Sequence, residues 1–162
     1  MSITIIGTGL FGTALALNLS SAGKSVTLWS SRENISQSFK SNQMALFENI
    51  KLIKVSDTLT MTESLKNALV TTSVLIMCKS SQYTSPFLEQ NSLLIKNLPI
   101  VFCAKGIDSE NLLLQTEIDD KIRPGQVNAV LTGPSFAKDI ALEKPTALTL
   151  ACNDLKKGVL LQ

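Results

Sequence analysis

The residues best suited to binding chemistry are three glycines near the amino terminus. Gly7, Gly9 and Gly12 have the spacing G-x-G-x-x-G and directly follow the apolar run Ile3–Ile6. In a dinucleotide-binding turn the first glycine permits a tight bend and the second lets the backbone approach a pyrophosphate. The third lets a helix pack closely on its strand. The spacing predicts a dinucleotide site, and the alternative is a small-residue turn that binds no nucleotide.

A helix is expected to follow this turn, from about Leu10 to Ala22, with Gly23 ending it. Its free amino-terminal amides, including those of Leu10 and Phe11, would point at a bound anion. The positive end of the helix dipole would lie at the same place. Binding at this turn is therefore expected to come from the backbone and not from side chains.

The end of the second expected strand indicates which dinucleotide would bind. A site for NAD normally has Asp or Glu roughly 20 residues after the glycines, bonded to the ribose 2′-hydroxyl. Here the chain reads Trp29–Arg32, with no carboxylate before Glu33. Ser31 and Arg32 could instead bind and neutralise a 2′-phosphate. This favours NADP or tolerance of both cofactors, although Arg32 could equally be a solvated residue in the first turn of a helix.

Further polar residues stand where other expected strands end. Lys105 and Gly106 follow an apolar run, and an ammonium group there would suit an anionic substrate, whereas a lone lysine could simply lie at the surface. The turn Gly133–Ala137 offers free amides and the Ser135 hydroxyl, which could bind a substrate oxygen or only cap a helix. Lys79–Ser81 forms another polar loop, and no role is assigned to Lys79.

Apolar runs of strand length alternate with segments of helical period. This alternation predicts an α/β, Rossmann-like, doubly wound and mostly parallel sheet with helices on both faces. The run Val74–Cys78 is apolar throughout and is expected to form a central strand. The other strands are expected at Ile3–Ile6, Ser25–Trp29, Lys51–Val55, Ile100–Cys103, Val127–Leu131 and Ala147–Ala151. Further helices are expected at Glu33–Met44, Phe87–Ile95, Leu112–Ile118 and Ser135–Leu142.

The length and apolar content of the chain predict one dinucleotide-binding domain over residues 1–152. Asn153 resembles a helix N-cap, so residues 153–162 are expected to begin a helix. This helix would lead toward a catalytic helical domain that the 162 residues do not include.

Composition limits the chemistry. A formal charge of +2, spread along the chain, gives no basic stripe for nucleic acid. The absence of histidine excludes Ser-His-Asp and Cys-His catalysis. The three cysteines match no metal-ligand spacing and are expected to be buried free thiols in a reducing cytoplasm.

Residues 2–22 could be mistaken for a signal peptide, but no cation precedes them and three glycines interrupt them. No membrane insertion is expected, and the chain is predicted to be cytoplasmic.

Four blocks together resemble bacterial NAD(P)-dependent glycerol-3-phosphate dehydrogenases: Gly7–Ala16, Leu28–Trp29, Ala104–Ile107 and Gly133–Lys138. The glycine turn alone fits many families, whereas the other blocks at these separations are specific to this one. The resemblance implies reversible hydride transfer between NAD(P)H and dihydroxyacetone phosphate. The product would be sn-glycerol 3-phosphate for phospholipid synthesis.

The resemblance also implies roles for individual residues. Lys105 would lie beside both cofactor and substrate, Gly133 and Ser135 would contact substrate, and Ala137 would contact cofactor. Four further positions match cofactor contacts: Leu10, Phe11, Ser31 and Arg32.

The chain departs from the family in two respects. The family usually has proline where this chain has Lys79, and the family's general-base lysine lies beyond residue 162, in a domain that also supplies most of the phosphate pocket and the dimer contacts. These 162 residues are therefore expected to contain no catalytic residue. The alternatives are a non-catalytic nucleotide-binding module or a truncated remnant of the enzyme. A related 2-hydroxy-acid or UDP-sugar dehydrogenase would not account for the Gly133–Ser135 block.

Overall fold

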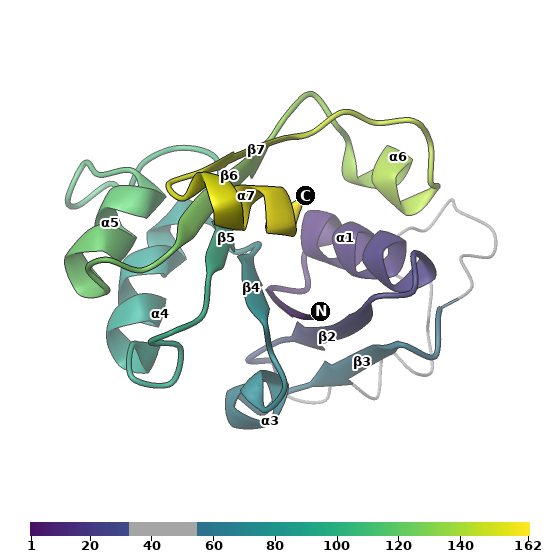
Figure 1. Cartoon of the computed structure of the whole chain (residues 1–162), viewed down its shortest axis with the longest axis horizontal. Helices are drawn as coiled ribbons and strands as arrows, with labels where there is room; N and C mark the ends of the chain where they lie inside the picture. The colour runs from purple at the N-terminus through teal and green to yellow at the C-terminus, as the bar shows by residue number, and fades with distance from the viewer. Residues whose placement is uncertain (33–54) are drawn as a thin grey trace.

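The described residues form one twisted sheet with helices on both faces (Figure 1). A computed structural model describes residues 1–32 and 55–162. The strand order is β3-β2-β1-β4-β5-β6-β7, and neighbouring strands are parallel except β6 and β7. This arrangement confirms the predicted doubly wound, mostly parallel sheet. The strands are β1 Ser2–Ile6, β2 Ser25–Trp29, β3 Leu59–Thr62, β4 Val74–Met77, β5 Ile100–Phe102, β6 Asn128–Thr132 and β7 Thr149–Cys152.

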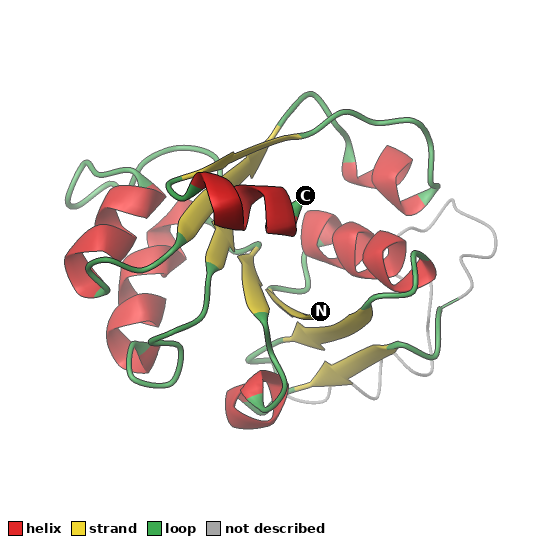
Figure 2. Ribbon diagram, in the orientation of Figure 1, coloured by secondary structure: helices red, strands yellow, loops and turns green. Residues whose placement is uncertain are grey.

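The helices of the described residues lie on both faces of the sheet (Figure 2). Helices α1 and α6 and the end of α7 pack on one face, and α3, α4 and α5 pack on the other. Among the described residues, no helix combines the length and the apolar character needed to cross a membrane. The helices are α1 Leu10–Ser21, α3 Leu65–Leu69, α4 Thr84–Asn91, α5 Gln115–Ile122, α6 Ala137–Ala141 and α7 Leu155–Leu161, and a short 3₁₀ turn, η1 Ser81–Tyr83, precedes α4.

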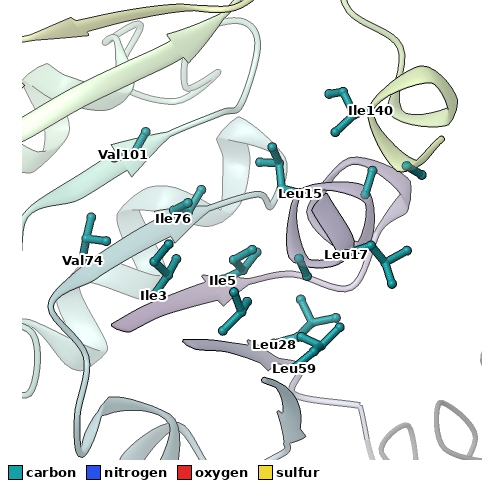
Figure 3. Packing of buried hydrophobic residues seen from close by; sticks show 14 of the residues in the cluster. Ile3, Ile5, Leu15, Leu17, Leu28, Leu59, Val74, Ile76, Val101 and Ile140 are labelled. Carbon is teal, nitrogen blue, oxygen red and sulfur yellow. The ribbon is translucent and has the colours of Figure 1, made fainter. Parts of the chain in front are cut away.

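Alternating side chains of β1 supply both halves of the core. Ile3 and Ile5 pack toward α1, in the cluster shown in Figure 3, whereas Ile6 packs toward α4 and α5 on the opposite face. All four residues of β4 are buried, as expected for a central parallel strand covered on both faces. The sheet is thus fixed at its centre by β1 and β4, the two strands between which its winding reverses.

Most strand predictions are confirmed to within two residues, but the third strand is not. The predicted strand Lys51–Val55 lies almost entirely outside the described residues, as does the predicted helix Glu33–Met44. The structure pairs Leu59–Thr62 with β2 instead. This segment alternates apolar and hydroxyl side chains at the edge of the described sheet, so it lacks the continuous apolar run of a central strand.

The predicted helix ends are shifted for local reasons. Helix α4 begins at Thr84, three residues earlier than predicted. Pro86 therefore lies in its first turn, where a proline is tolerated because the missing amide would have no partner there. Helix α5 begins at Gln115 and not at Leu112, because Leu112 has the left-handed φ of 54° and cannot continue a helix. At α7 the N-cap is Asp154, whose carboxylate accepts a hydrogen bond from the Lys157 amide.

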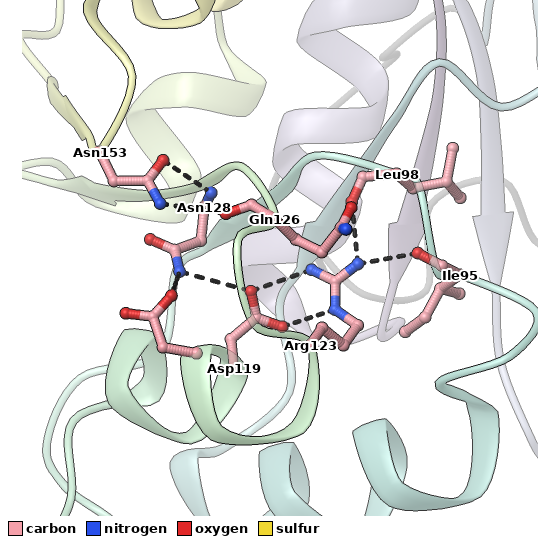
Figure 4. Close-up of polar contacts among 8 residues, drawn as sticks. Ile95, Leu98, Asp119, Arg123, Gln126, Asn128 and Asn153 are labelled. Carbon is pink, nitrogen blue, oxygen red and sulfur yellow. Dashed lines mark hydrogen bonds and ion pairs between the residues drawn. The ribbon is translucent and has the colours of Figure 1, made fainter.

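A buried ion pair anchors α5 to the amino-terminal edge of the sheet (Figure 4). The Arg123 guanidinium donates two hydrogen bonds to the Asp119 carboxylate, at 2.6 and 2.9 Å. It also donates to the carbonyl oxygens of Ile95 and Leu98, in the segment before β5. Asn128, at the start of β6, donates to Asp119 from the other side. Both charged groups thus have several hydrogen-bond partners, which offset the cost of removing the pair from water.

Asn153 contributes to the same edge and is not a helix cap. Its side-chain oxygen accepts a hydrogen bond from the backbone amide of Asn128 at 3.1 Å, and its side-chain nitrogen donates one to the backbone carbonyl of Gln126 at 3.1 Å. The predicted capping role of Asn153 is therefore wrong. The residue instead ties the end of β7 to the start of β6.

Replacing Arg123 with Met should strongly destabilise the fold. The substitution leaves the buried Asp119 carboxylate without its counter-ion, and removing one partner of such a pair costs about 3–5 kcal/mol. Urea unfolding followed by circular dichroism measures the change. Lys144→Met is the control, because it breaks an exposed ion pair with Asp139 and should cost less than about 1 kcal/mol. Equal effects of the two substitutions would contradict a stabilising role for the Arg123 network.

Candidate functional site

The candidate site lies where β1 and β4 end, at the point where the winding of the sheet reverses. Ligands of open α/β sheets bind in the crevice that forms at such a point. Two backbone hydrogen bonds hold the loops there: the Gly7 amide donates to the Trp29 carbonyl, and the Cys78 amide donates to the Ile6 carbonyl. The glycine turn is thus attached to both neighbouring strands.

Gly7 and Gly12 allow α1 to approach β1 closely. Gly7 has a φ of 113°, which L side chains rarely adopt. A Cβ atom on Gly12 would lie 2.2 Å from the Gly7 carbonyl oxygen, far inside van der Waals contact. The first turn of the helix therefore lies directly against the end of the strand.

Gly9 differs from the other two glycines of the turn. A Cβ atom placed on it would meet nothing within 4 Å. It is the N-cap of α1, with an ordinary φ of −70°, and forms no side-chain cap. Since the structure itself requires no glycine here, the open space above Gly9 suits a ligand that approaches the backbone.

A cavity of about 350 Å³ lies on the β2 side of the glycine turn. We call it the glycine-turn cavity. None of its lining residues is acidic, and two of them, Arg32 and Lys79, are cationic. The Ser30 hydroxyl accepts hydrogen bonds from the Thr8 hydroxyl and the Arg32 amide, which tie the turn to the end of β2. The lining residues are Gly7, Thr8, Gly9, Ser30, Ser31, Arg32, Cys78, Lys79, Ser80 and Tyr83.

A second cavity of about 350 Å³ lies on the β5 and β6 side, and we call it the Lys105 cavity. It shares Cys78, Lys79 and Ser80 with the glycine-turn cavity, so the two adjoin at the end of β4. Its lining also contains two lysines and no acidic residue. The lining residues are Phe11, Cys78, Lys79, Ser80, Cys103, Ala104, Lys105, Leu131, Thr132, Gly133, Ser135 and Leu148.

Two thiols form part of the Lys105 cavity wall. Cys78 and Cys103 follow the paired ends of β4 and β5. A hydrogen bond with the Cys103 thiol, together with burial, raises the pKa of the Cys78 thiol well above its usual value. The three cysteines of the chain are free thiols, as predicted, but they are half-buried where the prediction had them buried.

The loop after β6 is held close to the segment before β7. A Cβ atom on Gly133 would lie 2.7 Å from the Ala147 carbonyl oxygen, so only glycine fits there. The Ser135 hydroxyl donates to the same carbonyl at 3.0 Å. Helix α6 begins later, at Ala137, with Phe136 as its N-cap. The alternative role of Ser135 as a helix cap is therefore wrong.

The structure brings most of the predicted site residues together around the two cavities. Gly7, Gly9, Ser31 and Arg32 line the first, and Phe11, Lys105, Gly133 and Ser135 line the second. The remaining three line neither cavity: Leu10 begins α1 and is exposed, Gly12 packs on Gly7, and Ala137 packs against the core.

Sequence reasoning assigned no role to Lys79, which lines both cavities. The available signal was its position directly after the strand at which the winding reverses. Its ammonium group lies 5.4 Å from the centre of the Trp29 ring and 4.6 Å from that of Tyr83. Burial, and to a smaller extent the Arg32 charge, lowers the pKa of Lys79.

The chain matches a known protein family over most of its length. Residues 2–158 match the N-terminal part of NAD-dependent glycerol-3-phosphate dehydrogenase. A glycerol-3-phosphate dehydrogenase [NAD(P)+] of Rhodopseudomonas palustris is 33% identical over 153 residues, which cover 94% of this chain and 46% of the relative. One from Maricaulis maris is 36% identical over 161 residues, which cover 97% of this chain and 47% of the relative. The chain thus spans about half the length of these relatives.

A solved structure shows the same arrangement. Glycerol-3-phosphate dehydrogenase of Coxiella burnetii superposes with a TM-score of 0.88 at 27% identity, covering 99% of this chain and 49% of that chain. The likeness extends over the whole of the described sheet. It is a likeness to the corresponding half of the longer protein.

Substituting Ala at Gly12 should destabilise the fold more than substituting Ala at Gly9. Gly12→Ala forces a methyl group against the Gly7 carbonyl, and this overpacking should destabilise by about 1–3 kcal/mol despite the better helix propensity of Ala. Gly9→Ala meets open space and should cost less than about 1 kcal/mol. Urea unfolding of both variants measures the difference. An unchanged free energy of unfolding in Gly12→Ala would disprove the close contact between α1 and β1.

Proposed function

Because the chain belongs to the NAD-dependent glycerol-3-phosphate dehydrogenase family, over the part that its N-terminal model describes, we propose that it binds a nicotinamide dinucleotide across the carboxyl ends of β1 and β4. The pyrophosphate would lie over Gly9, against the free amides that open α1. The observation that supports this most directly is the contrast among the glycines. Gly7 and Gly12 are required by packing, whereas Gly9 faces open space.

The charges around this space also fit a dinucleotide. The first turn of α1 contains no acidic residue, and Gly9 provides no side-chain cap. The amides of the first turn of α1 are therefore available to an anion, which the helix dipole would further stabilise. Gly7, Gly9, Leu10, Phe11 and Gly12 would together form the turn that holds the pyrophosphate.

The end of β2 favours NADP, or use of both cofactors. Ser31 and Arg32 are exposed, line the glycine-turn cavity, and have no acidic neighbour among its lining residues. They would bind the adenosine ribose and its 2′-phosphate. Lys105 and Ala137 would contact the nicotinamide half, although Ala137 lines neither cavity in the structure described here.

The Lys105 cavity is the proposed place for a small anionic substrate. Lys105 offers an ammonium group, and Gly133 and Ser135 offer a rigid loop with a hydroxyl group. We propose dihydroxyacetone phosphate and glycerol 3-phosphate as the substrate pair of the complete enzyme. When bound, the dinucleotide supplies the hydride, and this chain's residues orient the substrate carbonyl toward it. The product would serve phospholipid synthesis in the cytoplasm.

In this proposal, residues 1–152 bind the cofactor and contain no catalytic base. Residues 153–162, which include α7, would lead into the part that supplies the base, most of the phosphate pocket and any dimer contacts. Residues 1–162 alone are then expected to bind the cofactor without detectable turnover of dihydroxyacetone phosphate. Turnover by these residues alone would show that a base lies among them.

Titration with NADPH and NADH, followed by nicotinamide fluorescence, tests the binding proposal. The wild-type chain should bind at least one of the two at or below millimolar concentration. Gly9→Ala should weaken binding at least about tenfold, because its methyl group would occupy the space through which the pyrophosphate approaches. Its free energy of unfolding, measured as described above, distinguishes lost binding from lost structure. Unchanged affinity in Gly9→Ala would rule out this position for the pyrophosphate.

A further inference from the structure

Lys79 occupies an unusual position for a lysine after a strand. Its side chain is half-buried and lies along the glycine turn, with its Cγ atom 3.2 Å from where a Cβ atom of Gly7 would stand. The ammonium group ends between the rings of Trp29 and Tyr83, at 5.4 and 4.6 Å from their centres. The two rings come from β2 and from η1, so Lys79 spans the glycine-turn cavity from β4 toward β2.

A second cation lines the same cavity as Lys79. Arg32 follows the end of β2 and lines the same space, and its charge acts on the Lys79 ammonium group. No residue that lines the cavity is acidic. The mutual repulsion of the two cations therefore has no counter-ion in the lining, and an anion bound between them would relieve it.

We propose that Lys79 and Arg32 together form a subsite for a phosphate group on the adenosine ribose of the dinucleotide, which makes Lys79 a specificity-determining residue. This inference rests on the proposed function, because it concerns the same ligand. It extends that function by assigning the choice between phosphorylated and unphosphorylated ribose to a lysine from β4, in addition to the residues that follow β2.

The position of Arg32 selects the ribose phosphate over the pyrophosphate. The residue after the second strand of a dinucleotide-binding sheet lies beside the ribose 2′-hydroxyl, whereas the pyrophosphate lies at the helix amides. A phosphate monoester carries a charge between −1.5 and −2 near pH 7, close to the combined charge of one lysine and one arginine. Arg32 can bind it in a bidentate manner, and Lys79 adds a mobile point charge.

In the absence of ligand, the Lys79 ammonium group makes cation–π contacts with the rings of Trp29 and Tyr83. A cation over a ring gains less free energy than a charge-assisted hydrogen bond to phosphate. Lys79 can therefore move from the rings of Trp29 and Tyr83 to the phosphate at a net gain. The rings also keep the side chain in the cavity instead of in solvent.

The test compares affinities for NADPH and NADH, which differ only in the 2′-phosphate. Isothermal titration calorimetry gives both dissociation constants for the wild type, Lys79→Met and Arg32→Met. Lys96→Met serves as the control, because it removes an exposed lysine between α4 and β5, at the opposite edge of the sheet. Thermal unfolding checks that each variant folds.

The wild type should prefer NADPH at least tenfold. Lys79→Met should reduce that preference about tenfold, through loss of NADPH affinity with NADH affinity nearly unchanged. Arg32→Met should act in the same direction, and Lys96→Met should leave the ratio unchanged. Raised ionic strength should weaken NADPH binding more in the wild type than in Lys79→Met.

Three outcomes would overturn the inference. A wild-type ratio near one would show that there is no subsite for the 2′-phosphate. Equal loss of both affinities in Lys79→Met would place Lys79 at the pyrophosphate or the adenine. Unchanged affinities with lowered thermal stability would reduce its role to the ring contacts. Failure of the wild type to bind either dinucleotide would instead refute the proposed function, so the two failures are distinguishable.

Discussion

The close contact between the first turn of α1 and the end of β1 is the constraint on which the rest of the site depends. The helix can begin there only because Gly12 presents no side chain to the Gly7 carbonyl, at a position where a methyl group would lie 2.2 Å away. The contact fixes the direction of α1 and hence the direction of its free amides. It also brings the end of β4 alongside, since a Cβ atom on Gly12 would lie 3.1 Å from that of Cys78.

Charge is arranged around this contact on one edge of the sheet. Arg32, Lys79 and Lys105 follow β2, β4 and β5, and the residues that line the two adjoining cavities include no carboxylate. The cations thus stand along a line from the β2 side to the β5 side, with the helix amides between them. A ligand with several anionic groups fits such an arrangement better than one with a single charge.

The sequence predicted the strands that are continuous apolar runs and the turn whose glycines have a required spacing. Residues 74–77 and 100–102 illustrate this, because burial on both faces leaves a continuous apolar run that can be recognised in the sequence. The edge strand Leu59–Thr62 could not be found in that way, since its register depends on pairing with β2. The environment of Lys79 was equally inaccessible: Trp29 and Tyr83 lie 50 and 4 residues away along the chain, and only the folded sheet brings both rings to the ammonium group.

The Arg123 network lies at the opposite, amino-terminal edge of the sheet. There Asp119, Asn128 and Asn153 form hydrogen bonds with one another, with Arg123 and with the backbone. Stability and ligand recognition are therefore concentrated at opposite edges of one sheet. Substitutions that alter cofactor choice can accumulate among the loops at the carboxyl edge without disturbing the polar network that secures the strands. In evolutionary terms, the domain can change what it recognises while the fold that supports recognition stays under separate selection.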